Sequence, residues 1–169
     1  MTANLNIGIR HVLPVYPFFA ILASSLFREP ARIRALALIL LVWHGAESAL
    51  AHPDYLPYFN QIARAREEKF LLDSNLDWGQ DLARLGRYVQ QHQIPVVQLG
   101  YFGFTAPSKV GVPHVSACCR QHDGWVAISV NRFFGIPNGV ELAPEWRKDR
   151  RPVARIGKSI WLYYDHPVA

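Results

Sequence analysis

Residues 11–51 read HVLPVYPFFAILASSLF-REPARIR-ALALILLVWHGAESALA, two apolar runs joined by a short charged connector. The first run, 11–27, and the second run, 35–51, each contain 17 residues, and the first has no Asp, Glu, Lys or Arg. A membrane-spanning helix needs about 17–25 mostly apolar residues. The pattern therefore predicts a hairpin of two transmembrane α-helices. A competing interpretation applies to the second run, because its uncharged part, 35–46, is also typical of a buried core helix.

The connector between the runs, 28–34, carries three positive charges, from Arg28, Arg32 and Arg34. A short arginine-rich loop between apolar runs is typical of the cytoplasmic side of a membrane. We therefore expect this tip in the cytoplasm and the flanking residues on the opposite side. The start of the chain does not predict a secretory signal, since Arg10 is the only basic residue before the first run. It is more typical of a piece of a longer protein.

The apolar residues are concentrated at the N-terminus. Half of the chain is hydrophobic and 18% is charged, whereas about a quarter of a typical soluble protein is charged. The net charge of +5 includes a basic run at 147–155. A solvated loop is the simpler explanation for this run, because no nucleic-acid-binding motif accompanies it, and we expect no nucleic-acid partner. The adjacent Cys118 and Cys119 lack metal-ligand spacing and are interpreted as packing residues or free thiols.

Residues 52–169 have the scattered charges and the turn-forming Gly and Pro residues of a globular domain. This part begins with a proline-interrupted aromatic segment, 52–60, which is typical of a membrane interface. Helical spacing and apolar runs then predict one helix at 77–91 and strands at 96–102, 124–130 and 159–164, with a further short strand at 70–72. This order predicts a small α/β layer with one βαβ unit. The expected fold is a transmembrane hairpin, 1–51, followed by a small extracytoplasmic α/β domain.

The densest polar cluster is DSNLDWGQD at residues 73–81, where a strand is expected to give way to a helix. Such a junction can present side chains and helix N–H groups to a sugar or phosphate, and a tryptophan face can stack on a sugar ring. The same pattern is also typical of a helix N-terminus, with Asn75 or Asp77 as the cap. The acidic residues lack the spacing of a calcium loop, so we expect no metal site here.

Several of these segments together resemble bacterial membrane glycosyltransferases of family 39, which are similar to protein O-mannosyltransferases and lipid A aminoarabinose transferases. The resemblance rests on NIGIRHVLPVYP at 6–17, YLPYFN at 55–60 and LDSNLDWGQDL at 72–82. The later segments YFG at 101–103, AIS at 127–129 and IGKSI at 156–160 also fit. The similarity runs in order over nearly the whole chain. One departure is ARAR at 63–66, where the family often has a Gly-Gly pair.

The resemblance implies a multi-pass GT-C-type enzyme in the bacterial inner membrane, with the C-terminal domain on the periplasmic side. Such an enzyme moves a sugar from a polyprenyl-phosphate donor to an acceptor. The family's catalytic acidic residues lie in a first extracytoplasmic loop that has no counterpart here, so no catalytic residue is expected in this chain. The implied partners are membrane lipid, a polyprenyl-phosphate-linked sugar and a separate N-terminal membrane portion. No cofactor is implied, and a requirement for a divalent metal is left open.

Two groups of candidate binding residues follow. Arg10 and His11 are expected at the outer end of the first span, where a cation is costly unless it meets a headgroup, water or an anionic ligand. We expect them to contact the lipid phosphate, with simple interfacial anchoring of Arg10 as the alternative. The candidates for the acceptor or sugar are Asn60, Asp73, Asn75, Asp77, Trp78, Gln80 and Asp81. The alternative function is a non-catalytic, membrane-anchored module that binds a glycan or a protein.

Overall fold

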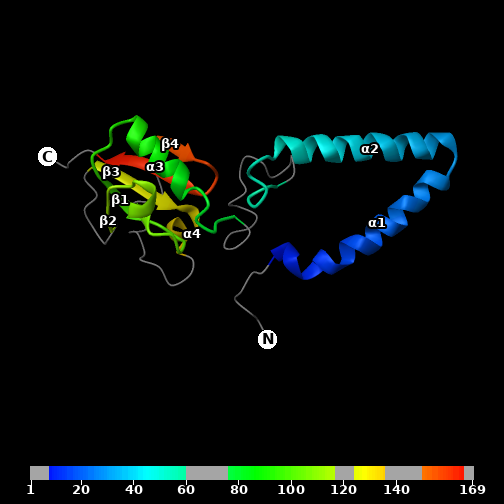
Figure 1. Cartoon of the computed structure of the whole chain (residues 1–169), viewed down its shortest axis with the longest axis horizontal. Helices are drawn as coiled ribbons and strands as arrows, with labels where there is room; N and C mark the ends of the chain where they lie inside the picture. The colour runs from blue at the N-terminus through cyan, green and yellow to red at the C-terminus, as the bar shows by residue number, and fades with distance from the viewer. Residues whose placement is uncertain (1–7, 60–75, 117–123, 136–149, 166–169) are drawn as a thin grey trace.

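The computed structural model describes residues 8–59, 76–116, 124–135 and 150–165, with backbone only for 8–11. Within these residues the chain forms an N-terminal pair of apolar helical arms and a separate domain built on a five-stranded sheet (Figure 1). The two parts meet at the residues that follow the second arm. The expected small α/β domain is therefore confirmed.

The first apolar run is helical but not one continuous α-helix. It consists of the 3₁₀ helix η1 (Gly8–Val15), the α-helix α1 (Tyr16–Ser24) and the 3₁₀ helix η2 (Ser25–Arg28). Pro14 lies inside η1 and Pro17 at the start of α1. Because proline lacks a backbone N–H, it is tolerated in a first helical turn but interrupts the hydrogen bonding of a helix interior. The arm is thus less regular than the single span predicted for 11–27, and its α-helical part, α1, has only nine residues.

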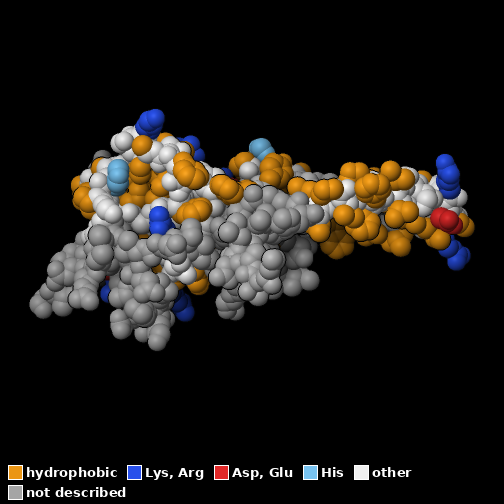
Figure 2. Space-filling view, turned by 90° about the horizontal axis from the view of Figure 1, so that it is seen from below, with side chains coloured by type: hydrophobic (Ala, Val, Ile, Leu, Met, Phe, Trp, Pro, Cys, Tyr) orange, Lys and Arg blue, Asp and Glu red, His pale blue; other side chains and the backbone are white. Residues whose placement is uncertain are grey.

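The second arm is α2 (Ala31–Leu50), a 20-residue helix that begins four residues earlier than predicted. Pro30 is the N-cap residue, with φ −50° and an extended ψ of 154°, so the helix begins directly after it. Among the described residues, α2 is the one helix long and apolar enough to cross a membrane, and none of its apolar window is buried. Figure 2 shows hydrophobic side chains along the arms and charged side chains gathered at their far tip.

The sheet of the folded domain has the order β2-β1-β3-β5-β4. Its strands are β1 (Val97–Gly100), β2 (His114–Ser116), β3 (Gly124–Ser129), β4 (Ala154–Ile156) and β5 (Ile160–Asp165). β1 runs parallel to both β2 and β3, whereas β5 runs antiparallel to β3 and β4. The three longer strands match those predicted, and β2 and β4 were not predicted. The predicted strand at 70–72 lies outside the described residues.

The alternation of side chains along the strands produces two hydrophobic clusters. Leu162 of β5 and Ala127 of β3 belong to the cluster that packs against α3 (Leu82–Gln91). Trp161 and Val126 belong to the second cluster on the opposite face, next to α4 (Val130–Phe133). The short 3₁₀ helix η5 (Pro107–Val110) connects β1 to β2. Both faces of the sheet are therefore covered, as in an α/β layer.

The helix predicted at 77–91 begins at Leu82, five residues later than expected. Gly79 has φ +81°, so the chain turns before the helix starts. Asp81 occupies the N-cap position, but its side chain makes no capping hydrogen bond. The prediction that Asn75 or Asp77 caps this helix is therefore wrong for Asp77, and Asn75 lies outside the described residues. The reason is tertiary: the Asp81 carboxylate is bound by another part of the domain.

Candidate functional site

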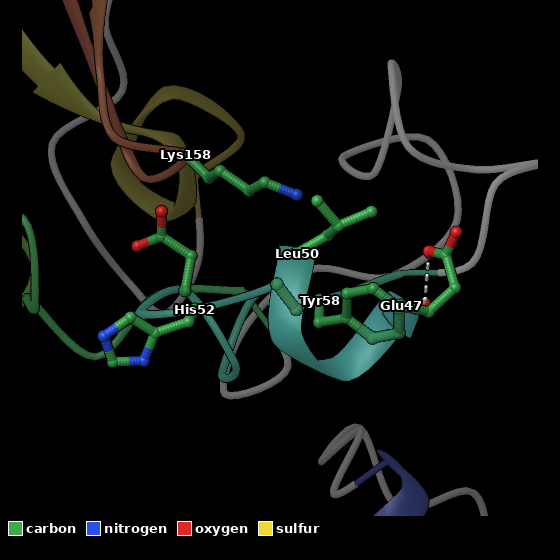
Figure 3. A pocket seen from close by; sticks show the side chains of 7 residues that line it. Glu47, Leu50, His52, Tyr58 and Lys158 are labelled. Atoms are coloured by element: carbon green, nitrogen blue, oxygen red, sulfur yellow. Dashed lines mark hydrogen bonds between the residues drawn. The ribbon is translucent and has the colours of Figure 1, made fainter. Parts of the chain in front are cut away.

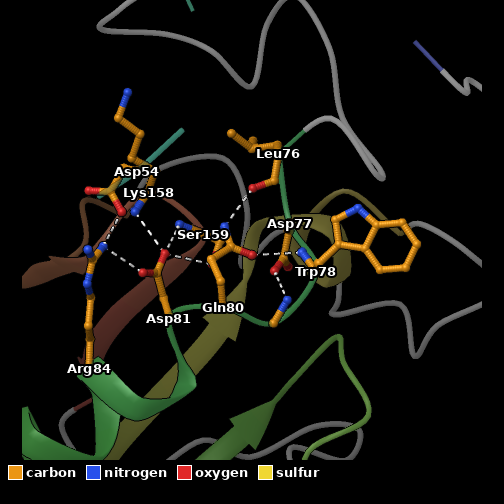
Figure 4. A network of polar contacts seen from close by, with 10 residues as sticks. Asp54, Leu76, Asp77, Trp78, Gln80, Asp81, Arg84, Lys158 and Ser159 are labelled. Carbon is orange, nitrogen blue, oxygen red and sulfur yellow. Dashed lines mark hydrogen bonds and ion pairs between the residues drawn. The ribbon is translucent and has the colours of Figure 1, made fainter. Parts of the chain in front are cut away.

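The Asp81 carboxylate is the centre of a polar network that joins distant segments (Figure 4). Its Oδ2 accepts hydrogen bonds from the backbone N–H groups of Lys158 and Ser159, both at 3.0 Å, and from the Ser159 hydroxyl at 2.9 Å. These residues lie in the turn between β4 and β5. Asp81 is 1% exposed, so these donors replace the water that the charge loses on burial. The network fixes the start of α3 to the β4–β5 turn.

The β4–β5 turn approaches Asp81 closely because residue 157 is a glycine. Gly157 has φ +58°, and a Cβ added to it would collide with the Asp81 carboxylate. The described part of the first polar segment, 76–81, and the segment 156–160 are therefore parts of one structural unit.

Arg84 extends this network to Asp54, in the segment that follows α2. One of its terminal nitrogens lies 2.8 Å from Asp81 Oδ1 and 2.6 Å from Asp54 Oδ1. The hydrogen bond that Arg84 donates to the Asp54 carboxylate is the main reason that the pKa of Arg84 is raised. Because Asp54 belongs to the segment after α2, the guanidinium connects that segment to the sheet domain.

A pocket of about 160 Å³ opens beside this connection, between the end of α2 and the β4–β5 turn (Figure 3). Its polar lining comes from Glu47, His52, Asp54, Tyr58 and Lys158, with Leu50 and Ala51 as apolar neighbours. Lys158 Nζ lies 3.5 Å from the Pro57 carbonyl oxygen, and Tyr58 Oη donates to Glu47 at 3.3 Å. The pocket thus combines one ammonium group with carboxylates, a phenol and an imidazole.

Asp77 is also fully buried next to this unit, but its carboxyl group has fewer hydrogen bonds than that of Asp81. Its Oδ1 accepts the Gly79 N–H at 2.8 Å, while its Oδ2 and the nearby Ser129 hydroxyl have no hydrogen-bond partner among the described residues. Burial raises the pKa of Asp77 to about 6, with the Gly79 hydrogen bond and the nearby Ser129 and Ser159 hydroxyls opposing this rise and the charge of Asp81 adding to it. A carboxyl group that is neutral below this pKa can donate a hydrogen bond to Ser129.

The remaining predicted residues lie in different surroundings. Trp78 is 44% exposed, and its ring points away from the network (Figure 4). Gln80 is exposed, but its amide is engaged within the loop, with Trp78 N–H at 2.8 Å and the Leu76 carbonyl at 3.0 Å. Arg10 and His11 lie in η1, and nothing is described of their side chains. Asn60, Asp73 and Asn75 lie outside the described residues.

The pocket residues were not identified from the sequence as a site. A usable signal was Glu47, a carboxylate near the end of an apolar run, because ionisable residues in such segments are costly and commonly functional. The approach of Lys158 was not predictable, since it lies 101 residues from Pro57 along the chain. In the described part of the chain, no three His, Cys, Asp or Glu side chains are grouped to hold a metal ion.

Comparison with known proteins does not identify the family. No family model matches the sequence, and no curated protein or solved structure matches it either. The residues and the geometry of the site are therefore the basis for the proposal that follows.

Proposed function

We propose that this chain is the membrane-anchored C-terminal part of a glycosyltransferase that uses a lipid-linked sugar, and that it contributes binding rather than the catalytic base. The observation that carries the proposal is the polar pocket at the end of α2, into which the sheet domain places Lys158. A polar pocket at the end of a membrane-length apolar helix is where the phosphate and sugar of a polyprenyl carrier would emerge from the lipid. The resemblance to family 39 transferases supports the same class of ligand.

On this proposal, the apolar arms are two transmembrane segments, with their arginine-bearing tip in the cytoplasm. The sheet domain and the pocket then lie at the periplasmic surface of the bacterial inner membrane. α2 has the length of a span, and the exposed hydrophobic residues of both arms support their contact with lipid. The segment 8–28 would cross with its 3₁₀ turns, and further helices around it would satisfy the backbone groups that its prolines leave unpaired.

The surroundings of Asp77 and Asp81 support a binding role for this chain rather than a catalytic one. A general base must lie within about 2.6–3.2 Å of the proton that it removes, or act through one water. Asp81 is surrounded by donors from the β4–β5 turn and Arg84, and Asp77 is 0% exposed. Neither carboxylate is presented to an acceptor. Trp78 is the exposed side chain of residues 76–81 best suited to stack on a sugar, and Arg10 and His11 stay the proposed contacts of the lipid phosphate.

The test is binding of polyprenyl phosphate to the purified full chain in lipid nanodiscs. We expect saturable binding that Lys158→Gln weakens by about tenfold, because an ammonium loses its contact with the phosphate. Lys109→Gln is the matched control, since Lys109 is an exposed lysine of η5, remote from the pocket. Equal affinity of the Lys158 variant and the unmodified chain would refute a phosphate site in this pocket.

A second assay separates binding from catalysis. We expect the chain alone to transfer no sugar from polyprenyl-phosphate donors to candidate acceptors. Transfer that appears only on co-expression with a separate N-terminal membrane portion would establish a split enzyme. Sustained turnover by this chain alone, abolished by Asp77→Asn, would show instead that the catalytic base lies in the sheet domain. Binding without any transfer in either experiment would favour the non-catalytic glycan-binding module.

A further inference from the structure

Three exposed aromatic side chains lie on loops that leave the same edge of the sheet. Phe104 is 94% exposed, Trp78 44% and Phe134 39%. Phe104 follows β1, Phe134 ends α4 after β3, and Trp78 precedes α3. Because β1 and β3 are parallel neighbours, the segments after them begin at the same edge.

Hydrogen bonds hold these loops together. Tyr101 Oη donates to the Gly79 carbonyl at 3.2 Å, which joins the loop of Phe104 to that of Trp78. Asn131 Nδ2 donates to the Asp77 carbonyl at 3.3 Å, and Arg132 Nε donates to the Tyr101 carbonyl at 3.2 Å. The aromatic residues are therefore carried by one connected surface rather than by three independent loops. We refer to Trp78, Phe104 and Phe134 as the aromatic edge.

The aromatic edge lies on the side of the domain that meets the helical arms. In the sheet register, Ser129 at the end of β3 pairs with Ile160 at the start of β5, so the β4–β5 turn is at this same edge. Lys158 of that turn contacts the Pro57 carbonyl, only seven residues after the end of α2. In agreement, α4 lies on the side of the domain toward the arms (Figure 1).

The segment between α2 and this edge is itself aromatic. Tyr55 is 57% exposed and Tyr58 is 38% exposed. Aromatic residues are enriched where a protein meets the interfacial layer of a bilayer, because an aromatic ring is apolar yet tolerates the polar headgroups. The aromatic edge thus lies at the end of the sheet that meets this aromatic segment, which starts where the membrane-length helix ends.

We propose that the aromatic edge rests in the interfacial layer of the bilayer that α2 crosses, so that the sheet domain is held against the membrane surface. This inference rests on the proposed membrane anchor. Lipid is the occupant because the edge lies at the same end of the sheet as the β4–β5 turn, which contacts the aromatic segment that follows α2. Phe104, the most exposed of the three aromatic residues, enters deepest.

The test uses the full chain in liposomes, with Cys118 and Cys119 replaced by serine and one new cysteine labelled with an environment-sensitive fluorophore. At Phe104→Cys we expect blue-shifted emission and about twofold or greater quenching by lipids brominated near the top of the acyl chains. Gln91→Cys is the control for the opposite edge of the sheet, because α3 ends where the chain turns toward the start of β1. A label there is expected to stay unquenched.

A third label, at Leu41→Cys in the middle of α2, reports the anchor separately, with lipids brominated near the ends of the acyl chains as its quencher because residue 41 would lie near the bilayer centre. Quenching at residue 41 together with unquenched, water-like emission at residue 104 would contradict the contact of the aromatic edge with lipid. The same result would support α2 as a membrane anchor. A blue shift at residue 104 without quenching by brominated lipid would show that protein rather than lipid covers this edge, and would also overturn the inference. No quenching at either position would overturn both the inference and the membrane anchor of the proposed function.

Discussion

Gly157 shows how one residue without a side chain determines the contact between two segments. Its positive φ and the adjacent Asp81 carboxylate leave no space for a Cβ. We expect Gly157→Ala to lower the free energy of unfolding by about 2 kcal/mol, since both backbone strain and loss of the Asp81 hydrogen bonds contribute. The measurement is urea unfolding of the chain in detergent. Gly45→Ala is the control, because an added Cβ there meets nothing within 4 Å beyond the adjacent residues and backbone of its own helix, and a loss of similar size in both variants would contradict the prediction.

The pKa of Asp77 predicts a specific dependence of stability on pH. Because the pKa is about 6 in the folded domain and 3.8 without burial, the folded state holds the proton more tightly. The contribution of Asp77 to stability is therefore complete below about pH 4 and is lost as the pH rises through 6. The loss is on the order of 3 kcal/mol as an upper bound, at about 1.4 kcal/mol for each unit of pKa shift.

We expect Asp77→Asn to remove this part of the pH dependence and to stabilise the domain at pH 7–8. The asparagine oxygen can still accept the Gly79 N–H, and its amide can donate to Ser129. The check is the difference in urea midpoint between variant and unmodified chain from pH 4 to 8. A difference that does not change with pH would show that Asp77 does not titrate in this range.

At the scale of elements, α3 is fastened to the segment after α2 through Arg84. Both members of the Arg84–Asp54 pair are partly exposed, with side-chain exposures of 28% and 30%. We therefore expect Arg84→Met to cost only about 0.5–1 kcal/mol of stability, but to accelerate hydrogen exchange in residues 52–58. Exchange in β3 should stay slow.

Arg87→Met provides the control on the same helix, because Arg87 is exposed. If exchange in residues 52–58 is the same in the Arg84 and Arg87 variants, the guanidinium does not hold that segment.

The elements also show what can be predicted from the sequence. The apolar spacing of Leu82, Leu85 and Val89 predicted α3, and the apolar runs predicted β1, β3 and β5, because each pattern is local. β2 and β4 have three residues each and are stabilised by their neighbours in the sheet. The start of α3 was misplaced because Asp81 binds Ser159, 78 residues away, and no local pattern reports such a contact. The pocket could not be predicted for the same reason, since it forms where α2 and the β4–β5 turn meet.

At the scale of the whole molecule, the distribution of charge predicts a topology. Arg28, Arg32 and Arg34 lie at the tip of the arms, at the opposite end of α2 from the sheet domain. We expect a cytoplasmic reporter fused at residue 30 to be active and an exported reporter fused at residue 60 to be active, with each inactive at the other position. Activity of the cytoplasmic reporter at both positions would contradict the transmembrane hairpin and restore the alternative of helices buried in a soluble assembly.

The short distance between the end of α2 and Lys158 has a kinetic and thermodynamic consequence for the proposed ligand. A carrier lipid diffuses in two dimensions, and a pocket fastened at the surface of that layer samples it at a high effective concentration. Little intrinsic affinity is then needed for high occupancy. A water-soluble headgroup analogue is not confined to this layer. Its dissociation constant, measured in solution, would therefore predict a lower occupancy of the pocket than the same headgroup reaches when it is attached to its lipid.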